Sequence, residues 1–168
     1  PKGLGWKYLN MLGYVEQVVG ITRNSMAIDL HHFRLILDSG AKGHCLSAGY
    51  PDLLVRLEDL PNNDQYNLKP RSDTEALQAH HSWPHPIYDT AEVFQWLGLK
   101  LDVIDREVRQ GSERVVDLNE IQHLGEYDLV IDPGTSEHCF NIARAAINLA
   151  GAVKGGGWIA QAIPISMF

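Results

Sequence analysis

The chain has 168 residues, of which 45% are hydrophobic, and a formal net charge of -7. This size and composition predict one domain with a substantial hydrophobic core. The acidic balance, with a pI near 5.5, argues against broad binding to a nucleic-acid backbone but leaves room for a local basic patch.

The sequence shows no sign of membrane insertion or secretion. No apolar run reaches the ~20 residues of a membrane-spanning helix, and the start PKGLGWKYLN has too few apolar residues for a secretory signal. The cysteines Cys45 and Cys139 lie far apart and form no CxxC motif. We therefore expect a cytoplasmic protein without a disulfide framework.

Residues 1–38 predict a helical preface, followed by an α/β domain over residues 39–168. Apolar residues recur at helical spacing within residues 9–19, and a second helical pattern runs from Met26 to Leu37. Such a preface would cover the first strand, form part of a substrate pocket or make a dimer face. The sequence leaves these three roles open.

A strand and a long polar segment come next. The apolar run His44–Tyr50 ends in Gly-Tyr-Pro-Asp and predicts a strand. Residues 58–86 are polar, hold four prolines and show little periodicity apart from Thr74–His80. Loops of this length are typically functional or disordered, so a substrate lid and a plain insertion are both compatible with the pattern.

The polar segment also carries three histidines, His80, His81 and His85. No cysteine or acid completes a tetrahedral set with them at a recognised spacing. We therefore expect no metal site.

A helix and two strands are predicted after the polar segment. Residues 90–97 predict a helix that Asp89 or Thr90 caps and Gly98 follows. Leu99–Asp105 and Arg114–Leu118 predict strands, each with an acid at or near its end. The eight residues between them, 106–113, are too few for a crossover helix.

The last part of the chain predicts a strand, a helix and another strand. Tyr127–Asp132 is an apolar run closed by Asp-Pro-Gly-Thr, and Asn141–Val153 has helical periodicity. We expect Gly155–Gly157 to stop this helix and Trp158–Ile163 to form the final strand. Strands that alternate with helices predict a Rossmann-like, doubly wound, mostly parallel sheet, with ligands at the carboxyl ends of its strands.

The motifs HCLSAGYPD, LDVID, VVDLNE, YDLVIDPGTSEH and NLAGAVKGGGWIAQ, in this order, resemble those of class I S-adenosylmethionine-dependent methyltransferases. The resemblance covers about residues 45–164. The first loop departs from the family, because it has a single glycine followed by Tyr50-Pro51 where a GxGxG-like run is usual. The sequence also ends at Phe168, before the last two antiparallel strands of the family, so a truncated product and a reduced variant are both expected possibilities.

The resemblance implies a set of cofactor-binding residues. Gly49 would lie in the first loop, and Asp52 would orient the methionine amino group of the cofactor. Asp105 would bind the ribose hydroxyls, and Asp117 or Asn119 would reach the adenine. The alternatives are that Asp105 faces solvent at a strand end and that Asp52 is an acid at a helix N-terminus.

Three residues are candidates for catalysis. An acid at the end of a buried strand, such as Asp132, is costly unless it is hydrogen-bonded or functional. Glu137 and His138 are similar to a Glu-His pair of some small-molecule O- and C-methyltransferases, where the histidine would act as a general base. The alternative is that Glu137 stabilises a helix N-terminus while His138 packs. Because the motif is DPGT and not DPPY, base methylation is not inferred.

The resemblance implies methyl transfer from S-adenosylmethionine to an unidentified acceptor. One alternative is a catalytically degenerate module with a structural or assembly role, which the glycine-poor first loop favours. Another is a different nucleotide binder, although no GxGxxG motif follows the first strand. A homo-oligomer or a larger assembly is compatible with each of these.

Overall fold

The computed structural model describes residues 18–19 and 27–162 and has an α/β fold. Its main sheet has six strands in the order β1-β8-β7-β3-β5-β6, and all the pairings in this sheet are parallel. The strands are β1 (Val18–Val19), β3 (Gly43–Ala48), β5 (Leu99–Asp105), β6 (Arg114–Val115), β7 (Tyr127–Asp132) and β8 (Val153–Gln161).

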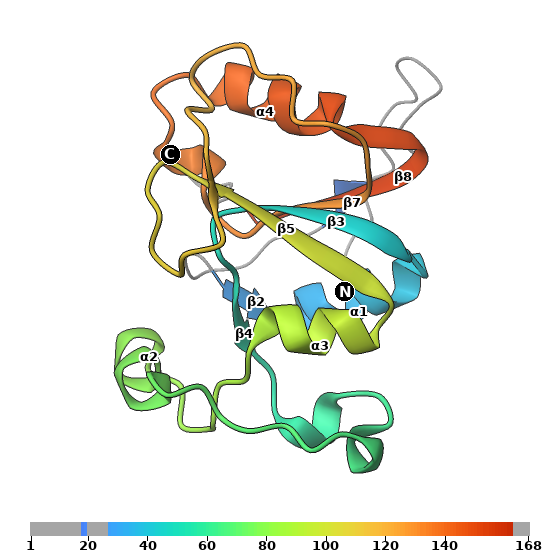
Figure 1. Cartoon of the computed structure of the whole chain (residues 1–168), viewed down its shortest axis with the longest axis vertical. Coiled ribbons are helices and arrows are strands. Elements are labelled where there is room, and N and C mark those ends of the chain that lie inside the picture. The colour runs from blue at the N-terminus through green and yellow to red at the C-terminus, as the bar shows by residue number, and fades with distance from the viewer. Residues whose placement is uncertain (1–17, 20–26, 163–168) are drawn as a thin grey trace, which may run out of the picture.

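Helices cover both faces of this sheet (Figure 1). Helix α1 (Leu30–Ser39) and helix α3 (Thr90–Trp96) lie on one face, and helix α4 (Ile142–Gly151) lies on the other. This arrangement is compatible with a Rossmann-like fold. A separate parallel pair joins β2 (Ala27–Asp29) to β4 (Asp52–Leu54).

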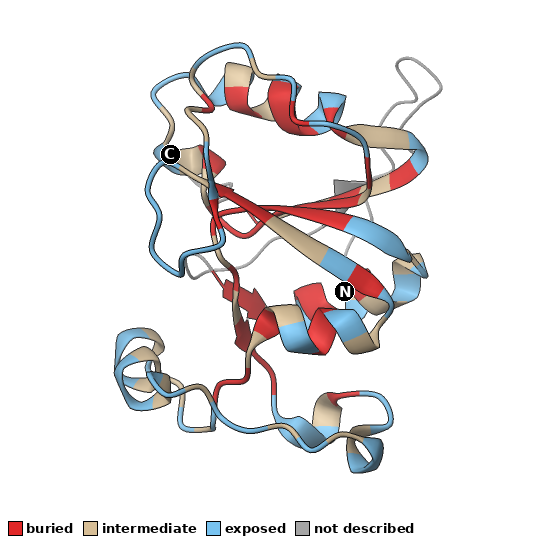
Figure 2. Cartoon of the chain, viewed as in Figure 1, coloured by how far each residue is buried: buried red, intermediate tan, exposed pale blue. Residues whose placement is uncertain are grey.

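The central strands β3 and β7 are buried on both faces, which explains their continuous apolar sequences. Leu46 and Val130 pack in the cluster that includes α4. Leu129 and Ile131 pack in the cluster of the opposite face, where Phe33 of α1 is fully buried. Figure 2 shows these strands as the buried centre of the chain.

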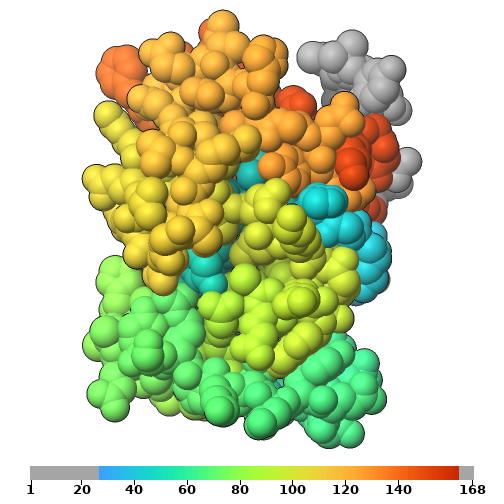
Figure 3. Space-filling view, viewed as in Figure 1, coloured from blue at the N-terminus to red at the C-terminus, as the bar shows by residue number. Residues whose placement is uncertain are grey.

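The polar segment 58–86 is an ordered insertion between β4 and α3. It contains short 3-10 turns at Leu57–Asp59 and Asn63–Gln65 and the helix α2 (Thr74–His81). Its surface is largely exposed (Figure 2), and it forms one end of the molecule (Figure 3). Tyr88 attaches it through isolated bridges to Leu53 and Pro70.

Several predicted elements are confirmed. The bounds of β5 and β7 are those predicted, and β3 lies within one or two residues of its predicted bounds. Asp89 caps α3 by accepting a hydrogen bond from the Glu92 N–H at 2.8 Å. Gly98 follows that helix with φ of 80°, a conformation that favours glycine.

The prediction that Gly155–Gly157 ends a helix is wrong. Helix α4 ends at Gly151, and the three glycines lie inside β8. Their strand shifts register against β7 between Tyr127 and Leu129, and a Cβ at Gly157 would meet the backbone oxygen of Asp128 at 3.0 Å. The glycines therefore permit a close, irregular strand approach instead of a helix stop.

The prediction of two preface helices needs two corrections. Val18–Val19 form a strand that pairs with β8, whereas residues 9–17 and Met26 lie outside the described residues. Ala27–Asp29 is a strand, and helix α1 begins at Leu30. The helix begins there because Asp29 caps it, accepting a hydrogen bond from the His32 N–H at 2.9 Å. The predicted boundary between residues 38 and 39 falls in the last turn of α1, which packs on the sheet.

Candidate functional site

The carboxyl ends of β3 and β7 form the point at which the order of the sheet reverses. From β3 the chain builds β5 and β6 on one side, and then β7 and β8 on the other. In open α/β sheets, ligands bind outside the strands at such a point. The Thr135 hydroxyl, after β7, donates to the carbonyl oxygen of Ala48 at the end of β3 at 2.5 Å, which links the two strand ends.

The loop after β3 begins with Gly49, which has φ of 81°. This left-handed conformation explains the glycine. Its N–H donates to the Ile104 carbonyl at 2.7 Å, and its carbonyl accepts from the Ser47 hydroxyl at 2.6 Å. The backbone groups of Gly49 are therefore occupied within the sheet.

Tyr50 turns the loop towards the insertion. Its hydroxyl donates to the Asp89 carboxylate at 2.8 Å, and the Arg71 guanidinium carbon lies 5.2 Å from the centre of its ring. Burial and the hydrogen bond to Asp89 raise the pKa of Tyr50. The tyrosine thus joins the loop to α3 and the insertion.

Asp52 lies in strand β4 and binds the insertion. Its carboxylate oxygens lie 2.9 Å from Nε2 of His81 and 3.4 Å from the guanidinium of Arg71. The side chains of His81 and Arg71 are only 4% and 8% exposed. No helix begins at Asp52, so its interpretation as a helix N-terminal charge is wrong.

Asp105 ends β5 at the same edge of the sheet. One of its carboxylate oxygens accepts the N–H groups of Arg106 and Glu107, at 2.6 and 3.4 Å. Within the described part of the chain, its other oxygen has no hydrogen-bond partner. A half-exposed carboxylate with one unengaged oxygen is suited to accept a hydrogen bond from a ligand hydroxyl.

Asp117 and Asn119 follow β6, which is shorter than predicted. One oxygen of Asp117 accepts the backbone N–H and the side-chain amide of Asn119, at 2.9 and 2.7 Å. These hydrogen bonds hold the pKa of Asp117 below its ordinary value. The Asn119 side-chain oxygen in turn accepts the N–H of Asn141, at the start of α4, at 2.8 Å.

Asn148 of α4 holds the loop that carries these two residues. Its amide donates to the carbonyl oxygens of Leu118 and Glu120, at 3.0 and 2.7 Å, and its oxygen accepts the Gln122 N–H at 3.1 Å. Asn148 is buried. This single polar side chain therefore fixes the loop after β6 against helix α4.

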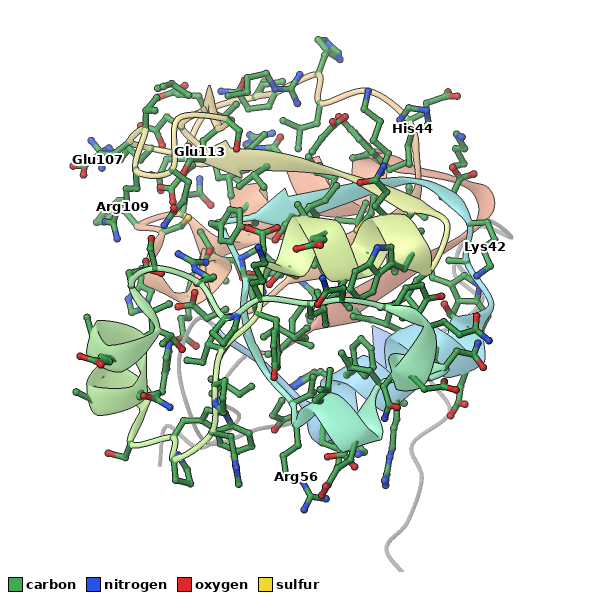
Figure 4. The ribbon with its side chains drawn as sticks, turned by 60° about the horizontal axis from the view of Figure 1, so that its bottom comes forward. Lys42, His44, Arg56, Glu107, Arg109 and Glu113 are labelled. Carbon is green, nitrogen blue, oxygen red and sulfur yellow. The ribbon has the colours of Figure 1, made fainter. Side chains whose placement is uncertain are left out.

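The connection between β5 and β6 has no helix, as the sequence predicts. Glu113, which is 8% exposed, holds this loop by accepting the N–H groups of Arg109, Gln110 and Ser112, at 3.2, 2.6 and 3.0 Å. Burial disfavours its charged form, but these hydrogen bonds lower the pKa of Glu113. Glu107 and Arg109 lie beside it in the same loop (Figure 4).

Asp132 is 1% exposed at the end of β7. One oxygen accepts the N–H groups of Thr135 and Ser136, at 2.8 and 3.2 Å. The other accepts the Ser136 hydroxyl and lies 3.4 Å from the side-chain nitrogen of Gln161. Both oxygens are therefore engaged, and the carboxylate holds the turn after β7.

Glu137 and His138 lie in the 3-10 turn Ser136–His138. His138 Nε2 is 3.4 Å from the Glu137 carboxylate, and the His138 side chain is 64% exposed. The histidine does not pack, contrary to the alternative interpretation. The next residue, Cys139, has its pKa raised by burial and by the carboxylates of Asp132 and Asp117, so it is a thiol at neutral pH.

Comparisons with protein-family models, with curated proteins and with solved structures find no match to this chain. No helix in the described residues is both long enough and apolar enough to cross a membrane. Residues 18–19 and 27–162 contain no group of three or more histidine, cysteine and acidic side chains that could hold a metal ion.

The structure gathers some of the predicted residues and separates others. The charges of Asp132, Asp117 and Arg106 all affect the pKa of Cys139. These three residues follow or end β7, β6 and β5, so the carboxyl ends of these strands lie near Cys139. Asp52 belongs to the insertion instead. Its partners Arg71 and His81 were not predictable from the sequence, because no local spacing connects them with β4.

Asp29 and His32 form a further pair that was not predicted from the sequence. Their imidazole and carboxylate are 3.0 Å apart at the start of α1. A signal exists in the Asp-x-x-His spacing, since an acid that caps a helix lies beside the residue three positions later.

Proposed function

We propose that this chain binds S-adenosylmethionine at the carboxyl ends of β3, β5 and β6 and transfers its methyl group to an acceptor. The observation that carries the proposal is the position of Asp105. It ends the strand next to β3, at the point where the sheet order reverses, and it keeps one carboxylate oxygen without a hydrogen bond from the described residues.

The residues present fit the nucleoside part of this cofactor. A carboxylate accepts hydrogen bonds from the two ribose hydroxyls, and Asp105 offers an oxygen that no other described residue engages. Asp117 and Asn119 lie beyond the neighbouring strand and carry polar groups suited to the adenine amino group. Gly49 supports the close approach of a ligand to the first loop, although its N–H is already bonded.

When bound, the cofactor would supply an activated methyl group carried on a sulfonium. The chain contributes alignment of the two reactants, the largest effect expected in such a transfer. Glu137 and His138 lie at the end of β7 and are proposed to face the acceptor. We place the reaction in the cytoplasm because Cys45 and Cys139 are free thiols.

A second proposal is a methyltransferase-like module that has lost cofactor binding and serves a structural role. It is favoured by the first loop, in which Tyr50 contacts Asp89 and Arg71 where the family has glycines. The engagement of both oxygens of Asp132 favours it too.

Calorimetric titration with S-adenosylmethionine and S-adenosylhomocysteine tests the two proposals. The sharpest variant is Asp105→Asn, which retains one acceptor oxygen for the Arg106 N–H and replaces the unengaged oxygen by an amide. We expect micromolar binding by the native chain and at least a tenfold loss in Asp105→Asn. Asp64→Ala is the matched control, because it removes an exposed acid in the insertion.

Binding that Asp64→Ala retains and Asp105→Asn loses would support the methyltransferase. The absence of binding by a chain with a cooperative melting transition would support the structural module. Equal binding by all three chains would refute the role of Asp105.

A further inference from the structure

The outer face of helix α4 is apolar. The buried side of this helix carries Ala145, Asn148 and Leu149. The opposite side is exposed and carries, at the helical spacing i, i+4 and i+7, Ala143, Ile147 and Ala150. Ile147 is 62% exposed, and Figure 1 shows α4 as the outermost helix on its side of the sheet.

The two helices on the other face of the sheet differ from α4 in this respect. Their exposed residues are all polar, with His31, Arg34 and Asp38 in α1, and Glu92 and Gln95 in α3. Arg144 is the one charged residue of α4. Because a helix that is apolar on all sides is typically buried, and because exposed apolar patches mark interaction sites, we expect the outer face of α4 to be covered by a partner.

The pattern of this face fits a second copy of itself. Two small residues, Ala143 and Ala150, stand one turn before and one turn after Ile147. When two such helices pack antiparallel about a twofold axis near Ile147, Ala143 of one copy comes opposite Ala150 of the other. The small side chains let the helices approach closely, and the two isoleucines meet at the axis.

The charges beside this face support the same arrangement. The Asn148 amide donates to the carbonyl oxygen of Glu120 at 2.7 Å, so the loop that carries Glu120 lies along one side of α4. Arg144 lies on that side too, because it is four positions before Asn148. Among the described residues, neither the Arg144 nor the Glu120 side chain takes part in an ion pair.

A twofold axis across the two helices keeps this side and reverses the direction of the helix. Arg144 precedes the axis, and the loop with Glu120 lies after it, so Arg144 of one copy comes opposite Glu120 of the other. The symmetry forms this pair of opposite charges twice. Two further exposed apolar residues, Phe140 before the helix and Ile121 in the loop, border the face.

We propose that the outer face of α4 is an interface between two copies of this chain, packed antiparallel about a twofold axis near Ile147, with Arg144 of each copy paired with Glu120 of the other. This inference does not depend on the proposed function. One short helix and one loop form a smaller interface than that of a stable complex, so the dimer is weak and forms at high concentration.

Sedimentation equilibrium of the full chain, from about 1 μM to about 1 mM, the range of weak complexes, tests the interface. We expect the average mass to rise with concentration towards that of two chains. Ile147→Glu places two carboxylates at the axis and should raise the dissociation constant of the dimer about tenfold or more. Val108→Glu is the matched control, because Val108 is 56% exposed in the loop between β5 and β6.

An exchange of charges tests the arrangement of the two copies. Arg144→Glu and Glu120→Arg should each weaken the dimer, and the chain with both substitutions should recover the native dissociation constant. The melting temperature of each variant is the control for folding. If it falls in Ile147→Glu, then Ala150→Glu, at the exposed end of the same face, takes its place.

Three results would overturn the inference. A chain that stays monomeric at every concentration would show that a second copy does not cover this face, and would leave the face to a different protein. A dimer that a folded Ile147→Glu chain forms as well as the native chain would lie on another surface. A double exchange that does not restore association would refute the antiparallel arrangement. Association that Ile147→Glu weakens, Val108→Glu retains and the exchange restores would support it.

Discussion

Replacing Asp132 by alanine removes the carboxylate that holds the turn after β7. That carboxylate accepts the N–H groups of Thr135 and Ser136 and the Ser136 hydroxyl, and it is 1% exposed. Each buried donor left without a partner costs about 1–3 kcal/mol. Since neighbouring losses are not additive, we expect Asp132→Ala to lower the free energy of unfolding by about 3–5 kcal/mol in total.

The effect is measured by thermal unfolding and by urea titration followed by circular dichroism. For a chain of this length, such a loss lowers the melting temperature by about 10 °C. Asp132→Asn is the matched variant: its amide oxygen still accepts the two backbone N–H groups, and the Ser136 hydroxyl can turn to accept from the amide nitrogen. We expect Asp132→Asn to lie within about 1 kcal/mol of the native chain.

Two results would refute this reasoning. An Asp132→Ala chain that melts within about 2 °C of the native one (close to the change that 1 kcal/mol causes at this chain length) would show that the turn does not depend on the carboxylate. An Asp132→Asn chain as unstable as Asp132→Ala would show that the charge, and not the hydrogen-bond geometry, holds the turn.

Three further predictions concern the framework of the site. Asn148→Leu removes the three hydrogen bonds that fix the loop after β6, so unfolding in urea should require about 2–4 kcal/mol less; an unchanged midpoint would contradict this. Glu113→Gln should lower stability by about 1 kcal/mol at pH 7. Because the folded-state pKa of Glu113 lies below its ordinary value of 4.5, the charged form stabilises the fold above pH 4.5, and the difference should shrink as the pH falls below it; a difference that grows in acid would have the wrong sign. Gly157→Ala should destabilise the chain because its Cβ would lie 3.0 Å from a backbone oxygen, whereas Gly151→Ala, with nothing within 4 Å, should be neutral or stabilising; equal melting temperatures for the two variants would refute the steric account of β8.

The sequence alone is sufficient for the parts of the fold that depend on local patterns. Strands β5 and β7 were predicted to the residue because each is a short run that contains leucine, valine and isoleucine and ends in an acid. The start of α3 was predictable from Asp89, and its end from Gly98, because capping is a contact between residues three or four positions apart. Asp105 and Asp132 were predicted to end their strands because the local sequence pattern also determines where each strand stops.

The tertiary structure decides whatever depends on a distant partner. A run of three glycines can end a helix or form part of an irregular strand. Gly155–Gly157 belong to a strand because β8 pairs with β7. Val18–Val19 have a pattern suited to a helix, but pairing with β8 makes them a strand. A helical period is local, whereas pairing with a strand more than 130 positions away is not.

The site follows the same division. The sequence determined that Asp105 and Asp132 end their strands, and hence that both lie at one edge of a parallel sheet. Asp117 comes after the end of β6, which is shorter than predicted. Only the folded chain decided how each carboxylate is used. Asp132 is engaged by its own turn and Asp52 by the insertion, whereas one oxygen of Asp105 accepts no hydrogen bond from the residues that the structure describes. Hydrogen-bond satisfaction is a property of the three-dimensional surroundings of a side chain, because its partners come from segments that no sequence spacing relates.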